Sequence, residues 1–260
     1  TLYARLGETI QADYTDATYG DTCSKTATIT PPTNTKVLYL SDPSQALDRI
    51  DPVATGDTTT ASSVALGSVA GTVTVDGTPS SSTVASARSL TFSHTTGSGT
   101  NRLLLVGVST ECTGTACGAS ADPTVSTVTF NGHALTFVGR AFANSNDAMV
   151  EIWALFNPAV STTSNVVVNL TGSTNLPIVA GAINFAGVNQ SQTLTFTGAN
   201  NNAGTLQVTI PSATNELVFS AVAWDDIPGS ASTAGSGQTQ RWTGDAGSNG
   251  SNGGTLTPSA

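Results

Sequence analysis

The residues of this chain that most readily do chemistry are its two histidines, its three cysteines and its acidic side chains. His94 lies in TFSHTT and His133 in FNGHAL, and neither has a second histidine or a cysteine at the spacing of a zinc site. The chain has no Gly-x-Ser-x-Gly nucleophile elbow, and no spacing of its Ser, His and Asp residues favours a catalytic triad. The sequence therefore predicts a protein that is not an enzyme.

Acidic and amide side chains offer two other kinds of site. A glycosidase needs two carboxylates across a cleft, and many acids could supply them without any spacing that selects a pair: Glu111, Asp122, Asp147, Glu151, Glu216, Asp225, Asp226 and Asp245. Calcium is the one metal ion that this composition favours, because loop carboxylates and carbonyl oxygens are its ligands. The candidate calcium ligands are Asn144, Asn146 and Asp147 in ANSNDAM, with Asp225 and Asp226 as a second set. The alternative is that these residues lie in ordinary solvated turns and bind no metal ion.

Tryptophan side chains could bind sugars by stacking on them. Trp153 and Trp224 lie within apolar runs and are expected in the core. Trp242 lies among polar residues in TQRWTG, and it is therefore the candidate for an exposed sugar-stacking platform.

The cysteines bear on location. Cys112 and Cys117 close a short loop in ECTGTACG and are predicted to form a disulfide. Cys23 is left over, either as a small buried side chain or as one half of a disulfide between subunits or an attachment point. A disulfide, a low charge content and abundant Ser and Thr together predict an extracellular or cell-surface location.

The amino-acid composition argues against some classes of partner and of fold. Charged residues make up 10% of the 260 residues, the net charge is -9 and the isoelectric point is about 4.3. Such a chain would repel phosphate backbones, so nucleic acid is not an expected partner. The sequence shows neither a signal peptide nor an apolar run long enough to span a membrane. The 26 glycines and few charges disfavour long helices.

Short apolar runs separated by Gly, Asn, Ser and Pro predict an all-β antiparallel sandwich of jelly-roll type. RLLLVGV and PIVAGAINFAG lack polar alternation, so both of their faces are predicted to be buried within a sheet. Asn131-Gly132 predicts a tight hairpin turn. The strands of a two-sheet sandwich are expected at 64–75, 86–93, 102–110, 125–131, 135–140, 148–156, 165–170, 178–188, 193–197, 205–210 and 216–224.

The chain divides into three predicted regions: an extended N-terminal β segment with a linker over 1–60, the sandwich over 63–227, and a Gly/Ser/Asn-rich loop or tail over 228–260. The first stretch, TLYARLGETIQADY, alternates like a half-buried strand and predicts a strand-donor face made of Leu2, Ala4, Leu6, Ile10, Ala12 and Tyr14. Pairing of this stretch within its own chain, with 25–30 or 36–40, is the alternative.

The runs SLTFSHTTGSGTNRLLLVGVS, VSTVTFNGHALTFVGRAF, MVEIWALFNP and LVFSAVAW, within 86–224, resemble a domain of uncharacterised function in bacterial secreted and surface proteins. This resemblance implies a jelly-roll or lectin-like sandwich with no catalytic residue. GETIQADYTDATYGDTCSKTATIT at 7–30 is similar to the last two strands of the Ig-like repeats of bacterial surface proteins.

Two functions are expected from these features. The first is an extracellular structural subunit of a surface filament, pilus-like fibre or sheath, in which the N-terminal strand completes a sandwich of another copy that lacks its closing strand. The partner is then a second copy of the chain, and no cofactor is needed. The alternative is a carbohydrate-binding or adhesive module, with glycans as partners and calcium as the one ion favoured.

Overall fold

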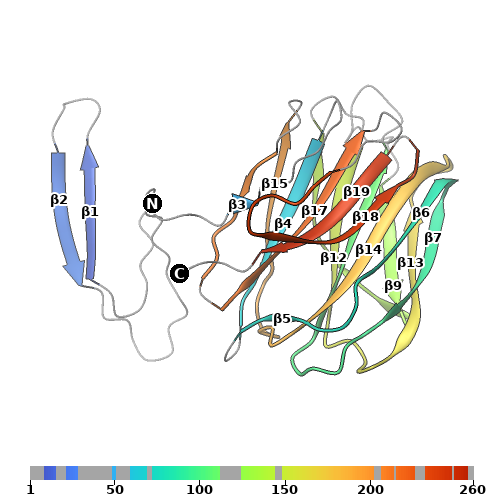
Figure 1. The fold of residues 1–260 in the computed structure, drawn as a ribbon, viewed down its shortest axis with the longest axis horizontal. Coiled ribbons are helices and arrows are strands. Elements are labelled where there is room, and N and C mark those ends of the chain that lie inside the picture. The colour runs from blue at the N-terminus through green and yellow to red at the C-terminus, as the bar shows by residue number, and fades with distance from the viewer. Residues whose placement is uncertain are drawn as a thin grey trace. The chain divides into compact units, whose positions relative to one another are not determined.

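The computed structural model describes residues 9–15, 22–28, 49–50, 59–68, 72–111, 124–143, 148–201, 206–213, 215–225, 232–247 and 249–256. These residues form antiparallel strands and no helix, which confirms the predicted all-β sandwich (Figure 1). Within them, no helix has the length and apolarity to cross a bilayer. The chain forms two compact units, Thr1–Leu47 and Asp48–Ala260, which we call the N-terminal and the C-terminal unit.

The described part of the N-terminal unit is one antiparallel pair of strands. β1 (Thr9–Thr15) pairs with β2 (Thr22–Thr28) along its whole length, with Ile10 opposite Ala27 and Tyr14 opposite Cys23. The opening strand therefore pairs within its own chain, as the alternative interpretation held. Leu2, Ala4 and Leu6 of the predicted donor face, and the predicted strand at 36–40, lie outside the described residues.

The described residues of the C-terminal unit form three large stacked sheets, one more than the sequence predicts, and one two-stranded pair. The middle sheet has the order β11-β12-β8-β14, and β14 also pairs with β5 and β6. Its strands are β5 (Thr74–Val75), β6 (Ser80–Ala87), β8 (Leu103–Glu111), β11 (Thr136–Phe142), β12 (Ala148–Phe156) and β14 (Leu176–Ala186).

The central strands of this sheet are buried on both faces. Leu103 and Leu105 of β8 pack in one apolar core, whereas Leu104 and Val106 pack in another. Because successive side chains of a strand point to opposite faces, a sheet with a core on each side needs apolar residues at every position. The prediction that RLLLVGV and PIVAGAINFAG lie mid-sheet with both faces buried is therefore confirmed.

One outer sheet has four strands in the order β10-β9-β13-β7. They are β7 (Ser89–Thr95), β9 (Val125–Phe130), β10 (His133–Ala134) and β13 (Thr163–Leu170). Asn131 and Gly132, between β9 and β10, have φ angles of 50° and 76° and form the predicted tight turn. This sheet and the middle sheet enclose one of the two large cores.

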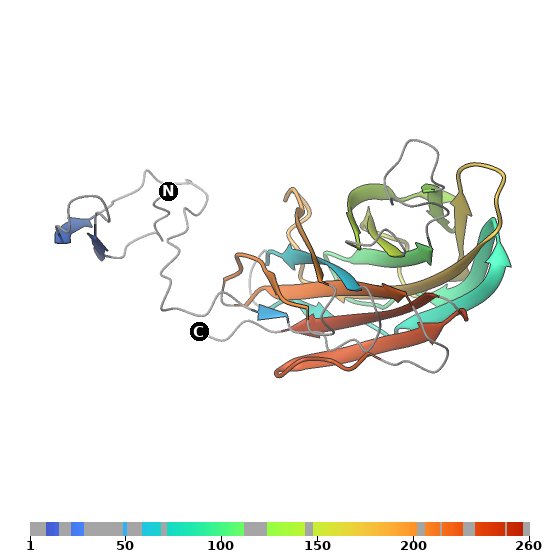
Figure 2. The ribbon, with the colours of Figure 1, turned by 90° about the horizontal axis from the view of Figure 1, so that it is seen from above.

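The other outer sheet has five strands in the order β15-β4-β17-β19-β18. They are β4 (Thr59–Leu66), β15 (Thr195–Asn201), β17 (Leu217–Asp225), β18 (Gln238–Asp245) and β19 (Asn249–Leu256), seen in Figure 2 on the opposite side of the stack from β9 and β13. A two-stranded pair, β3 (Arg49–Ile50) with β16 (Val208–Thr209), lies beside this sheet. Val208 of β16 and the nearby Leu206 pack in one small apolar cluster with Trp224 of β17.

Two predictions about the C-terminal region are wrong. The stretch 228–260 was expected to be a loop or tail, yet 238–245 and 249–256 are strands. The sandwich was expected to lack its closing strand, yet β19 pairs with β17 over eight residue pairs and with β18 on its other side. Backbone pairing, one large side chain and hydrogen bonds of Ser251 and Thr255 hold these strands, so they carry no apolar alternation that the sequence could reveal.

Candidate functional site

The most concentrated set of buried polar contacts surrounds Glu151, the one acid within the apolar strand β12. Its side chain has no exposed surface and faces the core between the middle and four-stranded sheets, as that of Trp153 does two residues later. Directly across from it on β11 lies Arg140, whose side chain is 26% exposed. Strand pairing therefore places a carboxylate and a guanidinium side by side at the rim of this core.

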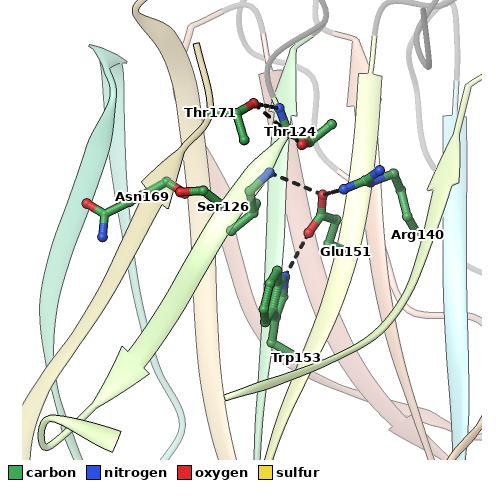
Figure 3. Close-up of polar contacts among 8 residues, drawn as sticks. Thr124, Ser126, Arg140, Glu151, Trp153, Asn169 and Thr171 are labelled. Carbon is green, nitrogen blue, oxygen red and sulfur yellow. Dashed lines mark hydrogen bonds and ion pairs between the residues drawn. The ribbon is translucent and has the colours of Figure 1, made fainter. Parts of the chain in front are cut away.

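Four donors surround the carboxylate (Figure 3). Arg140 donates to Oε1 of Glu151 from Nε at 2.7 Å and approaches it with Nη2 at 2.6 Å. The backbone N–H of Val125, at the start of β9 in the facing sheet, donates to the same oxygen at 3.3 Å. Trp153 donates from Nε1 to Oε2 at 2.8 Å. One side chain thus links two neighbouring strands and the sheet that faces them.

Burial dominates the electrostatics of this cluster. Desolvation raises the pKa of the Glu151 carboxyl above its ordinary value, because a charge is costly away from water. The charge and hydrogen bond of Arg140, the indole N–H of Trp153 and the N–H of Val125 act in the opposite direction, but they do not cancel the effect of burial. Arg140 is in turn held by the rings of Phe137 and Phe142, at 5.4 and 5.7 Å from its guanidinium carbon.

Hydroxyl groups fix the backbone beside the cluster, where β9 begins (Figure 3). The N–H of Thr124 donates to Oγ1 of Thr171 at 2.8 Å, and the N–H of Thr171 donates to the carbonyl of Thr124 at 2.7 Å. Ser126 donates from Oγ to the carbonyl of Asn169 at 2.9 Å. These bonds flank the register shift between Asn169 and Leu170, and they hold the Val125 N–H in reach of Glu151.

This arrangement joins neighbouring strands and facing sheets. A glycosidase pair requires a second carboxylate, and within the described residues Glu151 bonds to a guanidinium, an indole and a backbone amide. Both of its oxygens are hydrogen-bonded and neither is exposed. Alternation along β12 puts Glu151 on one face with Met149 and Trp153, but nothing in the sequence indicated Arg140 as the partner. The only available signal was a lone acid and a lone arginine in adjacent apolar strands.

A second buried titratable group, His94, lies on β7 in the same core. His94 is 2% exposed and lies between Ser80 on β6 and Asn184 on β14. Its ring packs edge to face on that of Phe130, with 6.0 Å between the ring centroids. Desolvation lowers the pKa of His94 below its ordinary value, while the hydrogen bond to Asn184 opposes this shift. The imidazole is therefore neutral at physiological pH.

His94 should make the protein less stable in mild acid. A group whose pKa is lowered on folding contributes stability above its ordinary pKa of about 6.5. That stability is lost as the pH falls toward the folded pKa, at up to about 1.4 kcal/mol per pH unit. Urea unfolding between pH 7.5 and 5.5 should show this slope in the wild type and a weaker slope in His94→Gln.

The matched control is His133→Gln, which changes the exposed histidine at the start of β10 and should keep the wild-type slope. The raised pKa of Glu151 contributes a slope of opposite sign above the ordinary pKa of a carboxyl, so the slopes of the variants are compared with that of the wild type and not with zero. Equal slopes in the wild type and in His94→Gln would contradict the assignment.

The prediction that Trp242 is an exposed sugar-stacking residue is wrong. Its side chain is 6% exposed and belongs to the core between the middle and five-stranded sheets. There it packs on Phe219, with 5.7 Å between the ring centroids. The space for the indole exists because Gly181 and Gly253 have no side chain: a Cβ on either would overlap the ring. The polar neighbours of Trp242 in the sequence point away from this core and concealed its burial.

Most of the other predicted site residues lie outside the described part of the chain. These are Cys112 and Cys117, the calcium candidates Asn144, Asn146 and Asp147, and Asp226. Asp225 ends β17, and Cys23 lies in β2 opposite Tyr14. Among the described residues, no group of three His, Cys, Asp or Glu side chains could hold a metal ion. Two described acids accept backbone N–H groups: Asp76 accepts from Gly99 at 3.0 Å, and Asp245, at the end of β18, accepts from Gly247 at 2.6 Å.

Comparison with known proteins gives no family, no curated relative and no solved structure that matches this chain.

Proposed function

We propose that this chain is a structural subunit of an extracellular filament, pilus-like fibre or sheath, and that its copies join through β-strand pairing. The observation that carries the proposal is the β1–β2 pair of the N-terminal unit. A two-stranded hairpin is at best marginally stable in water, and each strand has an edge that no described strand pairs. Strands from another copy would supply hydrogen-bond partners for these edges.

The C-terminal unit supports the same proposal through what its buried polar groups do. Glu151, the one acid in the apolar strand β12, is enclosed between sheets and hydrogen-bonded to a neighbouring strand and to the facing sheet. Such contacts rigidify a scaffold. A subunit that joins others by strand pairing requires a rigid scaffold and a strand pair that is only marginally stable alone.

The sandwich does not lack a strand, so the contact we propose is addition to a sheet edge and not completion of a gap. β18 is the acceptor we favour, because among the described strands it pairs with β19 alone and ends the five-stranded sheet. A contact between the N-terminal pair of one copy and β18 of the next would be head-to-tail, and it would propagate without closing.

Deletion of residues 1–28 should abolish assembly and leave a folded sandwich. We expect the full chain to form polymers by electron microscopy and light scattering, and the truncated chain to stay monomeric with its β-type circular dichroism spectrum. Because the truncated chain keeps its acceptor edge, adding it to the full chain should also shorten the polymers. Polymers of unchanged length formed by the truncated chain itself would rule out this contact.

The carbohydrate-binding alternative depended on an exposed Trp242, and Trp242 is buried. A glycan array with the full chain, with and without a calcium chelator, distinguishes the two functions. The structural proposal predicts no saturable binding to any glycan.

A further inference from the structure

Three polar side chains from three strands meet at the edge of the core between the middle and four-stranded sheets. Oγ of Ser80 lies 2.8 Å from Nδ1 of His94, and Nε2 of His94 lies 3.1 Å from Oδ1 of Asn184. His94 and Asn184 are each 2% exposed, whereas Ser80 is half-buried. A hydroxyl near the surface is thus joined through an imidazole to a buried amide.

The topology brings these residues together across two sheets. Ser80 begins β6 in the middle sheet, and the chain then turns at Arg88 into β7 of the four-stranded sheet. His94 continues the inward-facing series of Leu90 and Phe92 on β7, where a third apolar residue would be expected. Asn184 holds the corresponding position on β14, after Ala182.

The hydrogen bonds place the single proton of the neutral ring on Nε2 of His94 and leave the lone pair on Nδ1. The amide oxygen of Asn184 can only accept, so Nε2 of His94 carries the proton that it donates. In the neutral ring, Nδ1 then has a lone pair and accepts from the Ser80 hydroxyl. This is the relation of a nucleophile to its general base, with Asn184 as the residue that positions the base.

We propose that Ser80 is an activated nucleophile and a site of covalent acylation, with His94 as its general base. Oγ of Ser80 attacks the carbonyl carbon of an activated ester or thioester, and the new Oγ–C bond replaces the bond to the leaving group. Nδ1 of His94 takes the hydroxyl proton and passes it to the leaving group or to water. The products are an O-acyl serine and the free alcohol, phenol or thiol, so no oxidant or metal is needed.

Access to Ser80 comes from the rim of the sandwich. Among the described strands, β6 pairs with β14 alone, and the neighbouring residues Thr78 and Ser81 are exposed. An acyl group on Oγ would therefore lie at the sheet edge. This proposal goes beyond the structural role above, since acylation of one serine neither requires nor prevents assembly of the chain.

Acylation with p-nitrophenyl acetate, read by mass spectrometry of peptides from the full chain, tests the proposal. We expect an acetyl group on Ser80 at a rate about 10²- to 10⁴-fold above that of Ser81, the exposed serine beside it. Ser80→Ala should remove the modification, and the matched control Ser81→Ala should not. His94→Gln should lower the rate at Ser80 to that of Ser81.

The pH profile separates a general base from a structural contact. Only neutral His94 can accept the proton, so the acylation rate should rise with pH through the lowered pKa of His94 and then stay level up to pH 8. The groups that face the ring are Ser80, Asn184, Phe130 and, by strand pairing, Ser164, none of which titrates in this range.

Two results would overturn the proposal. One is labelling of Ser80 at the rate of Ser81, and the other is an unchanged rate in a folded His94→Gln variant. Should His94→Gln not fold, the pH profile of the wild type and the Ser80→Ala variant still decide the question. A rate at Ser80 that follows hydroxide concentration, without a plateau, also contradicts the role of His94.

Discussion

Replacing Trp242 by alanine should lower the free energy of unfolding by about 3–5 kcal/mol, the range for removal of a large aromatic side chain from a core. The indole is buried against Phe219 and above Gly181 and Gly253, so its loss leaves a cavity between two sheets. Trp242→Phe should be milder. It keeps most of the apolar contact and removes an indole N–H that is buried without a partner among the described residues.

The fit between Trp242 and the glycines gives this prediction a strict control. Gly181→Ala places a methyl group within the volume of the indole ring and should destabilise the wild type by about 1–3 kcal/mol. In the Trp242→Ala background the same change should cost little, because the ring is gone. Gly254→Ala is the matched control, since its Cβ would meet Oγ of Ser220 and the carbonyl of Thr239 at an ordinary 3.4 Å.

Chemical denaturation of the four single variants and the double variant measures these differences. Additive effects of Gly181→Ala and Trp242→Ala would mean that the two positions do not contact each other. Such a result would contradict the packing of the C-terminal strands on the middle sheet.

Arg140→Met should destabilise the protein by about 3–5 kcal/mol at neutral pH, because it leaves the Glu151 carboxylate buried without its cation. The effect should shrink in acid. Burial already raises the pKa of Glu151, and removal of Arg140 takes away the two largest opposing causes. A carboxyl with a raised pKa contributes stability below its ordinary pKa, and this stability is lost as the pH rises through the folded value.

Urea unfolding at pH 7.5 and at pH 5 gives the required comparison. The double variant Arg140→Met/Glu151→Gln should recover much of the loss, since no buried charge remains. Arg88→Met, at an exposed arginine between β6 and β7, should have little effect at either pH. A loss of stability in Arg140→Met that is the same at both pH values would show that packing of the arginine stem, and not the charge of Glu151, is responsible.

Local patterns in the sequence were enough to predict the fold class and many strands. The 148–156 strand agrees residue for residue with β12, and Asn131-Gly132 forms the predicted turn. The range 64–75 covers what are two separate strands, β4 and β5. The serine-rich β6 was not predicted, because SSSTVASA lies at a sheet end and carries too few apolar side chains to show a period.

The sequence by itself determined that this protein is built of strands with a mid-sheet pair buried on both faces, because those properties follow from the order of apolar and turn residues along the chain. Only the tertiary structure decided the partners of its polar and isolated side chains. Arg140 meets Glu151, Ser80 meets His94, and Trp242 fills the space above two glycines on other strands. Each of these contacts depends on sheet register and stacking, which join distant segments and leave no local pattern to read.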